Sequence, residues 1–324
     1  MPAVLVVGRA EVAEVLPMRE CIEAMSEVLA AHARGEMHQP LRSVTMPEAS
    51  DGFMGLMPAH RGGERPLYAL KAVCVFPGNP ARGLDAHQGT VTLFDGKTGR
   101  PTAILDASAI TAIRTAAVSA LATRVLAADD ARELAILGAG VQAAAHLEAL
   151  RAVRDFERVR IYSPTREHAE QLAGRAGAAV ADSAESALRG AHVVVTATNS
   201  REPVLRRDWL APGAHVNAVG ASAPSSRELD TATVAACSLF ADSRESVLNE
   251  AGEFQLAVRE GAIEGPDHIR AELGEVVAGM HPGRTGAEEL TVFRSLGLAI
   301  EDMAAAERAT ENARKRGAGV EVDL

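Results

Sequence analysis

One glycine-containing stretch, residues 134–143, constrains the fold of this chain more than any other. It runs Leu-Ala-Ile-Leu-Gly138-Ala-Gly140-Val-Gln-Ala, so that an apolar run breaks into Gly-x-Gly-x-x-Ala and helix-forming residues follow. The first glycine of such a pattern permits a tight strand-to-helix turn, and the second lets the backbone approach a pyrophosphate. The helix N-terminus then offers N–H groups and a partial positive charge to the phosphates. The stretch predicts a dinucleotide site; the alternative is a tight turn without a ligand.

Strands and helices alternate regularly around this stretch. Such alternation predicts a parallel sheet with helices on both faces, the Rossmann-type doubly wound α/β architecture. The sequence indicates strands at 133–137, 158–162, 179–181, 192–196, 214–219 and 237–241, with helices at 141–152 and 166–176.

The region before it has a different pattern, in which short strands accompany an early helix at 18–34. Strands are expected at 53–57, 68–76, 89–94 and 102–105, and the turn Asp95–Gly99 predicts a hairpin between the last two. A long helix is expected over 109–127, and the tail from about residue 291 is expected to be helical and to return to the first domain. We therefore expect a discontinuous α+β domain (1–115 with 300–324) and a dinucleotide-binding domain (116–299).

Composition excludes several classes of function. The net charge of −10 and the aromatic content of 3% argue against a nucleic-acid partner, which needs basic charge and stacking surfaces. The three cysteines lie far apart, which is typical of reduced cytoplasmic thiols and predicts neither a disulfide framework nor a metal site. The N-terminus lacks the basic region of a signal peptide, and no apolar run approaches the roughly 20 residues that span a bilayer. We expect a cytoplasmic protein with no membrane partner.

The end of the second predicted strand bears on the kind of dinucleotide. An Asp or Glu at this position hydrogen-bonds the ribose 2′-hydroxyl and favours NAD. Here the sequence has Ser163, Thr165 and Arg166 instead, and two hydroxyls with a guanidinium can hold a 2′-phosphate. NADP(H) is therefore favoured and NAD(H) is possible; alternatively, Ser163-Pro164 is only a turn and Arg166 is solvated.

Three basic residues before the dinucleotide stretch lie in apolar surroundings. Lys71 interrupts an apolar strand, Arg114 lies beside the apolar face of the 109–127 helix, and Arg42 precedes a strand region. A buried charge is costly unless it is paired, and burial also lowers the pKa of a lysine. Each residue alone is explained by a structural ion pair, whereas three converging cations would suit a small carboxylate substrate.

Ordered blocks of sequence resemble the ornithine cyclodeaminase/mu-crystallin family over essentially the whole chain. The resemblance implies a homodimer, whose first domain holds the substrate and the dimer contacts, and hydride transfer at the α-carbon of an amino or imino acid. The blocks are Lys71, Ala86–Val91, Ile110–Ser119, Ile136–Ala143, Pro212–Ser222, Arg227–Asp230, Ala271–Val276 and Thr291–Gly297.

The same resemblance implies the site residues by position. Arg42, Lys71, Gln88 and Arg114 would hold the substrate, with Lys71 and Arg114 also catalytic. Ser163 stands where NAD-using members carry an aspartate. The residues expected at the cofactor are Gly138, Gly140, Val141, Gln142, Ser163, Thr165, Arg166, Thr198, Val219 at the end of strand 216–219, and Ser295.

One position departs from the ornithine cyclodeaminases. Those enzymes carry an aspartate where this chain has Ser222, and the block Asn217–Pro224 is closer to mu-crystallin, which resembles a ketimine reductase. A serine can position a water or donate a hydrogen bond, but it cannot act as a carboxylate base.

The resulting hypothesis is an NAD(P)H-dependent reductase of cyclic ketimine carboxylates. Arg42 and Arg114 would clamp the anion, and Lys71 or a water on Ser222 would protonate the imine. The alternatives are an ornithine cyclodeaminase, an alanine-type amino-acid dehydrogenase, and a crystallin-like binding protein without catalysis.

Overall fold

The computed structural model describes residues 3–221 and 223–324. The chain divides into two compact units, Met1–Arg114 with Gly297–Leu324 and Thr115–Leu296. These bounds differ by one to three residues from the boundaries expected from the sequence. The predicted fold class, which combines a parallel α/β unit with a discontinuous α+β unit, is confirmed.

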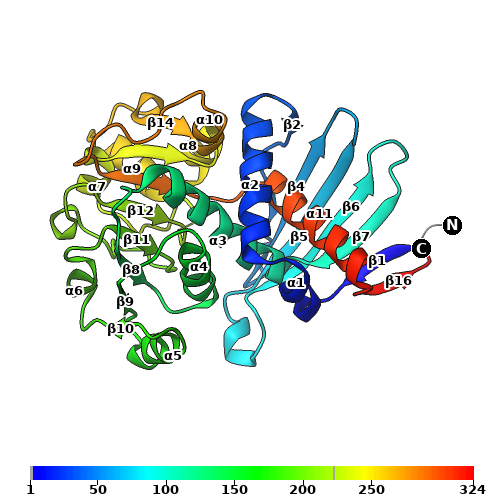
Figure 1. Ribbon diagram of the computed structural model, residues 1–324, viewed down its shortest axis with the longest axis horizontal. Coiled ribbons are helices and arrows are strands. Elements are labelled where there is room, and N and C mark those ends of the chain that lie inside the picture. The colour runs from blue at the N-terminus through cyan, green and yellow to red at the C-terminus, as the bar shows by residue number, and fades with distance from the viewer. Residues whose placement is uncertain (1–2, 222) are drawn as a thin grey trace. The chain divides into compact units, whose positions relative to one another are not determined.

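The first unit is built on a sheet in the order β16-β1-β7-β6-β5-β4-β2, with β3 paired to β4. Its neighbours are antiparallel except for β1 and β7, and the 95–99 turn joins β6 to β7 as expected. Helices α2 and α11 pack together, and α11 lies on the sheet against β4, β5 and β6 (Figure 1). The strands are β1 (Val4–Val7), β2 (Met37–His38), β3 (Ser43–Thr45), β4 (Phe53–Arg61), β5 (Leu67–Val75), β6 (His87–Asp95), β7 (Pro101–Asp106) and β16 (Val320–Val322); the helices are α1 (Arg9–Val15), α2 (Met18–Ala33), η1 (Asn79–Arg82) and α11 (Ala299–Arg316).

Alternation along β4 and β5 decides which side chains reach the core of this unit. Odd-numbered residues such as Met57, Ala69 and Lys71 are buried on the side of α11, whereas the even-numbered ones are half-buried or exposed. A strand with period-two burial has one face on the core and one facing away from it. Lys71 therefore lies on the core side of its strand.

The second unit is a parallel sheet in the order β10-β9-β8-β11-β12-β15-β13-β14. The strand order reverses between β8 and β11, and in open parallel sheets ligands bind at the carboxyl ends of the strands on either side of such a point. The strands are β8 (Glu133–Leu137), β9 (Arg158–Tyr162), β10 (Ala179–Val180), β11 (Val193–Thr196), β12 (His215–Ala218), β13 (Ser238–Ala241), β14 (Ile269–Glu272) and β15 (Thr291–Arg294). The helices that begin in this unit are α4 (Val141–Arg151), α5 (Arg166–Ala176), α6 (Ala184–Leu188), η2 (Arg207–Trp209), α7 (Thr231–Ala236), α8 (Arg244–Glu250), α9 (Gly252–Arg259), η3 (Pro266–His268) and α10 (Leu273–Val277).

One expectation from the sequence is wrong. The tail is not helical from residue 291: Thr291–Arg294 form β15, fully buried between β12 and β13, and α11 begins only at Ala299.

Helix α3 (Ala107–Leu126), which runs from the first unit into the second, is long and apolar enough to cross a membrane. Because 72% of its apolar window is buried within the protein, it has the character of a core helix.

Candidate functional site

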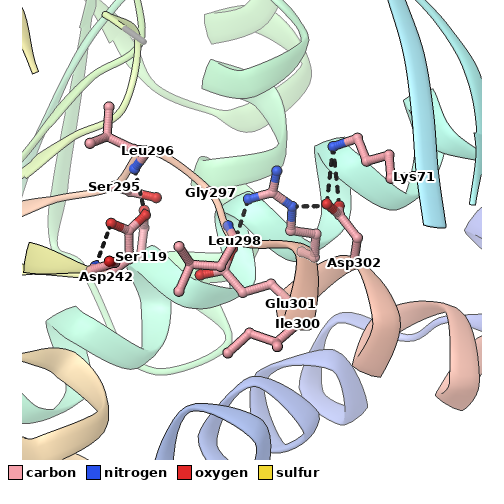
Figure 2. A network of polar contacts seen from close by, with 12 residues as sticks. Lys71, Ser119, Asp242, Ser295, Leu296, Gly297, Leu298, Ile300, Glu301 and Asp302 are labelled. Atoms are coloured by element: carbon pink, nitrogen blue, oxygen red, sulfur yellow. Dashed lines mark hydrogen bonds and ion pairs between the residues drawn. The ribbon is translucent and has the colours of Figure 1, made fainter. Parts of the chain in front are cut away.

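Lys71 and Arg114, two of the three predicted cations, meet on one carboxylate of the first unit. Lys71 Nζ lies 3.2 Å from both oxygens of Asp302, and Arg114 Nε donates to Asp302 Oδ1 at 2.9 Å. Arg114 Nη1 also donates to Glu301 Oε2 at 2.8 Å. These four side chains are at most 5% exposed. Figure 2 shows Glu301 and Asp302 side by side at the start of α11, with Lys71 on Asp302.

Burial, together with the neighbouring charges, shifts the pKa of Lys71. Burial lowers its pKa from 10.5 to about 8, while the adjacent Asp302 carboxylate opposes this shift and Arg114 and Arg42 add to it. A lysine with this pKa is protonated at neutral pH and releases its proton more readily than an exposed one. The arrangement suits proton donation by Lys71 to a bound substrate.

The other two predicted substrate residues, Arg42 and Gln88, make contacts outside the Lys71–Asp302–Arg114 cluster. Arg42, just before β3, donates from Nη2 to the carbonyl oxygen of Gly297 at 2.9 Å. Gln88, in β6, is exposed and donates to the carbonyl of Asp85 at 3.0 Å. The structure thus joins Lys71 and Arg114 through Asp302. Arg42 is hydrogen-bonded to the 297–298 peptide, and Gln88 is hydrogen-bonded to the backbone of the loop that precedes its own strand.

The turn after β8 in the second unit has the features that a pyrophosphate requires. Gly138 has a φ of +117°, and a Cβ there would lie 2.4 Å from the carbonyl oxygen of Ala197. Gly140 is the N-cap of α4, no side chain caps that helix, and its first turn contains no acidic residue. A Cβ on Gly140 would meet open space, and Val141 is 56% exposed. The helix N-terminus is therefore open to an anion, so the residues present fit a dinucleotide.

Polar atoms without hydrogen-bond partners lie near the same edge of this sheet. Gln142 Oε1, on the first turn of α4, is buried without a partner among the described residues, and so is Ser295 Oγ directly after β15. Val219 follows β12, and its N–H donates to Thr196 at the end of β11. Buried polar groups are rarely left unpaired, so these atoms are candidates for contacts with a bound cofactor.

A carboxylate that was not predicted from the sequence organises this edge. Glu228 is completely buried and accepts four hydrogen bonds, from the N–H and hydroxyl of Thr198, the hydroxyl of Thr196 and the N–H of Gly220. All four are 2.7–2.9 Å long. Glu228 thereby fixes the loops after β11 and β12, including the predicted cofactor residue Thr198. Its signal in the sequence was membership of the Arg227–Asp230 block.

The residues proposed to select the cofactor lie at the end of β9 and the start of α5. Ser163 follows β9 and is half-buried, and Thr165 is the N-cap of α5 without a side-chain capping bond. Arg166 is 59% exposed and pairs with Glu170 at 2.8 Å and Asp182 at 3.0 Å. A phosphate at this position would compete with those two carboxylates for the guanidinium.

Ser222, the third predicted catalytic residue, and the two carboxylates at the start of α11 remain to be placed. Ser222 lies outside the described residues, so its role remains a prediction. Glu301 and Asp302, which pair the buried cations, were not singled out from the sequence. Their signal was two adjacent carboxylates between the apolar residues Ile300 and Met303, which need partners if that turn is buried.

Comparisons with known proteins show what this chain is similar to. The model of the ornithine cyclodeaminase/mu-crystallin family matches residues 3–317. The chain is 43% identical over 274 residues to the ketimine reductase mu-crystallin of Mus musculus, covering 84% of each chain.

Two solved structures are similar over nearly the whole chain. One is the Δ1-pyrroline-2-carboxylate reductase of Thermococcus litoralis in complex with NADH and L-proline, with 36% identity, a TM-score of 0.93 and coverage of 98% of this chain and 100% of that one. The other is an archaeal alanine dehydrogenase dimer with bound NAD, with 34% identity, a TM-score of 0.93 and 99% of each chain covered.

Proposed function

The chain belongs to the ornithine cyclodeaminase/mu-crystallin family, and we propose that this member reduces the C=N bond of small cyclic imino acids with NAD(P)H. It is an oxidoreductase of imino and amino acids, the reverse reaction being oxidation of the amino acid. The observation that carries the substrate assignment is the Lys71–Asp302–Arg114 cluster, in which a protonated amine is buried beside a guanidinium. The favoured substrates are pyrroline-2-carboxylate and piperideine-2-carboxylate, each with one carboxylate and one C=N bond.

The residues of the first unit have separate tasks in this proposal. Arg42 and Arg114 bind the substrate carboxylate and so fix the face of the ring that reacts. Nε and Nη1 of Arg114 bind Asp302 and Glu301, and these two carboxylates orient the guanidinium for the substrate. Lys71 donates a proton to the imine nitrogen, since a protonated C=N bond accepts hydride more readily than a neutral one.

The second unit holds the cofactor in this proposal. The N-terminus of α4 after Gly140 binds the pyrophosphate, and Gln142, Thr198, Val219 and Ser295 line the remainder of the site. When bound, the reduced nicotinamide supplies the hydride. Glu228 keeps Thr198 in place through its hydrogen bonds.

A substrate panel tests the reaction. Purified protein is given pyrroline-2-carboxylate, piperideine-2-carboxylate, ornithine, lysine or alanine with each nicotinamide cofactor, and net cofactor oxidation or reduction is followed. We expect steady consumption of reduced cofactor with a cyclic imine. Release of proline and ammonia from ornithine without net cofactor change would identify a cyclodeaminase instead. Cofactor binding without turnover of any compound would identify a binding protein.

We propose a preference for NADP(H), supported by the absence of a carboxylate at position 163. The ion pairs of Arg166 are exposed, and such pairs contribute only about 0–1 kcal/mol, so a 2′-phosphate can displace Asp182 and Glu170. A charge-assisted hydrogen bond to phosphate is worth about 1.5–3 kcal/mol, which predicts a kcat/KM ratio of about 10–100 in favour of NADPH.

Two substitutions check this preference. Ser163→Asp places a negative charge beside the 2′-position and is expected to invert the ratio of kcat/KM for NADPH and NADH, whereas Arg166→Ala is expected to bring it close to one. The imine KM serves as the control and should stay unchanged in both variants. A wild-type preference for NADH would refute the proposal.

We propose that the protein is a homodimer formed by the first unit, as the solved alanine dehydrogenase relative is a dimer. The sheet face turned away from α11 carries apolar side chains at even positions of β4 and β5. Met54 is 43% and Tyr68 48% exposed, and Leu56 and Leu70 are half-buried. A contiguous apolar sheet face of this kind is typical of a protein–protein interface.

Leu70→Arg tests the dimer, because a charge at the centre of a buried sheet interface is costly. Size-exclusion chromatography with light scattering should give the mass of two chains for the wild type and of one chain for Leu70→Arg. Leu248→Arg, at an exposed leucine of the second unit, is the control and should leave the dimer intact. A wild-type monomer, or a dimeric Leu70→Arg variant, would contradict the proposed interface.

We also propose a cytoplasmic location. It is supported by the three cysteines, Cys21, Cys74 and Cys237, which are free thiols as expected in a reducing compartment.

A further inference from the structure

Gly297, the residue at which the chain re-enters the first unit, is packed against the guanidinium of Arg114. Its φ is +83°, in the left-handed region that favours glycine. A Cβ built on Gly297 would lie 2.6 Å from Nη1, 2.7 Å from Nη2 and 3.0 Å from Cζ of Arg114. Real Cβ atoms do not approach other atoms so closely, so a side chain at this position and the present place of Arg114 exclude each other.

The three distances also give the direction of the contact. Both terminal nitrogens are closer to the Cβ position than the carbon between them, so that position lies off the outer edge of the guanidinium fork. The other nitrogen, Nε, is held by Asp302, and Nη1 is also held by Glu301. Gly297, Glu301 and Asp302 thus surround the guanidinium of Arg114, and all three belong to one short segment at the start of α11 (Figure 2).

The same segment also fixes Arg42. The carbonyl oxygen of Gly297 accepts a hydrogen bond from Arg42 Nη2 at 2.9 Å. The next N–H, that of Leu298, donates at 3.1 Å to Glu301 Oε2, the oxygen that accepts from Arg114. The two arginines, which are 72 positions apart in the chain, therefore share the 297–298 peptide as a common support.

We propose that Gly297 is a positioning residue that sets the places of Arg42 and Arg114 and thereby makes the enzyme select substrates that carry an α-carboxylate. This rests on the proposed function, in which these arginines bind the substrate carboxylate. A methyl group at position 297 turns the guanidinium away from Glu301 or Asp302, and the peptide that holds Arg42 moves with it. The substrate carboxylate then loses a charge-assisted hydrogen bond, while the cofactor site of the second unit keeps its residues.

Gly297→Ala tests this with two pairs of compounds. The first pair is pyrroline-2-carboxylate and 1-pyrroline, which lacks the carboxylate; the ratio of their kcat/KM values measures carboxylate selection. We expect Gly297→Ala to lower this ratio about 10–100-fold, the range for loss of one charge-assisted hydrogen bond, with the KM for NAD(P)H unchanged. The second pair is L-proline and pyrrolidine, whose affinities measured by calorimetry should show the same loss without turnover.

Gly317→Ala is the matched control. Gly317 also has a positive φ, +65°, but a Cβ there meets nothing within 4 Å, so this variant has the backbone strain without the contact. It should keep the wild-type ratio. A folded Gly297→Ala variant that keeps the ratio, or a Gly317→Ala variant that loses it equally, would overturn the inference. A wild type that reduces no imine would instead refute the proposed function, and the proline measurement would still decide the role of Gly297.

A double variant covers the case in which Gly297→Ala folds poorly. Arg114→Lys removes the guanidinium fork, so Gly297→Ala should lower the Tm less in the Arg114→Lys protein than in the wild type. Equal losses in both backgrounds would show that the contact with Arg114 is not the cause and would overturn the inference.

Discussion

Lys71→Met is expected to lower kcat for imine reduction by about 10²–10⁴-fold, the usual contribution of a positioned general acid. Methionine keeps roughly the volume of lysine and removes its charge. Lys71 is 4% exposed and held by both oxygens of Asp302, so water cannot easily take its place. The KM for NAD(P)H should change little, because the predicted cofactor residues all belong to the other unit of the chain.

Steady-state kinetics at neutral pH, together with cofactor binding followed by fluorescence, measure this effect. Lys97→Met is the control, since Lys97 is an exposed lysine in the 95–99 turn and its loss should leave kcat unchanged. Near-normal turnover by Lys71→Met would make Lys71 a structural cation and would refute its role as proton donor.

The stability expected for the Lys71→Met variant depends on Asp302, which binds both Lys71 and Arg114. In the Lys71→Met variant Asp302 would lose one partner and keep the Arg114 Nε bond, so we expect a loss of about 1–3 kcal/mol in unfolding free energy.

Lys71 also makes a pH-dependent contribution to stability. Its pKa is lowered from 10.5 to about 8 by burial, so between these values the unfolded chain binds more protons than the folded one. The contribution of Lys71 to stability therefore rises with pH across that window. Lys71→Met should lack this rise.

Local sequence patterns predicted the parts of the fold that local physics determines. Gly138 and Gly140 predicted the β8–α4 turn, because the backbone needs a positive φ at Gly138 and an uncrowded helix start at Gly140. Alternation of strands and helices predicted the parallel sheet. The buried cations Lys71 and Arg114 were recognisable as charges in apolar surroundings.

Local sequence patterns could not predict contacts between residues that are distant in the sequence. Asp302 lies 231 positions from Lys71 and 188 from Arg114, so no local spacing reveals the pair. Strand β15 was mistaken for the start of the terminal helix because its four residues, Thr291–Arg294, are all buried and show no period-two alternation. A short, fully buried strand cannot be told from a buried helix by periodicity alone.

Asp302→Asn is expected to shift the pH dependence of kcat/KM toward acid. The carboxylate of Asp302 opposes the effect of burial on the Lys71 pKa, whereas Arg114 and Arg42 act with it. With an uncharged amide at position 302, the Lys71 pKa falls below about 8, by about 1–3 units, the usual effect of one charge at contact distance. The reaction needs protonated Lys71, so the descending limb of the profile moves down by the same amount.

Glu301→Gln is the matched variant that separates this effect from a general disturbance of the cluster. Glu301 lies on the same turn and binds Arg114, whereas the carboxylate that raises the Lys71 pKa and bonds to its amine is that of Asp302. Glu301→Gln should raise the imine KM and leave the descending limb of the kcat/KM profile at its wild-type pH. Asp302→Glu keeps the charge, so its descending limb should lie closer to the wild-type pH than that of Asp302→Asn. The charges of Lys71 and Arg114 also act on His87: burial of its ring and these two cations lower its pKa, so its titration adds no limb above neutral pH. If Asp302→Asn loses activity equally at every pH, the carboxylate orients the two cations without controlling the proton on Lys71.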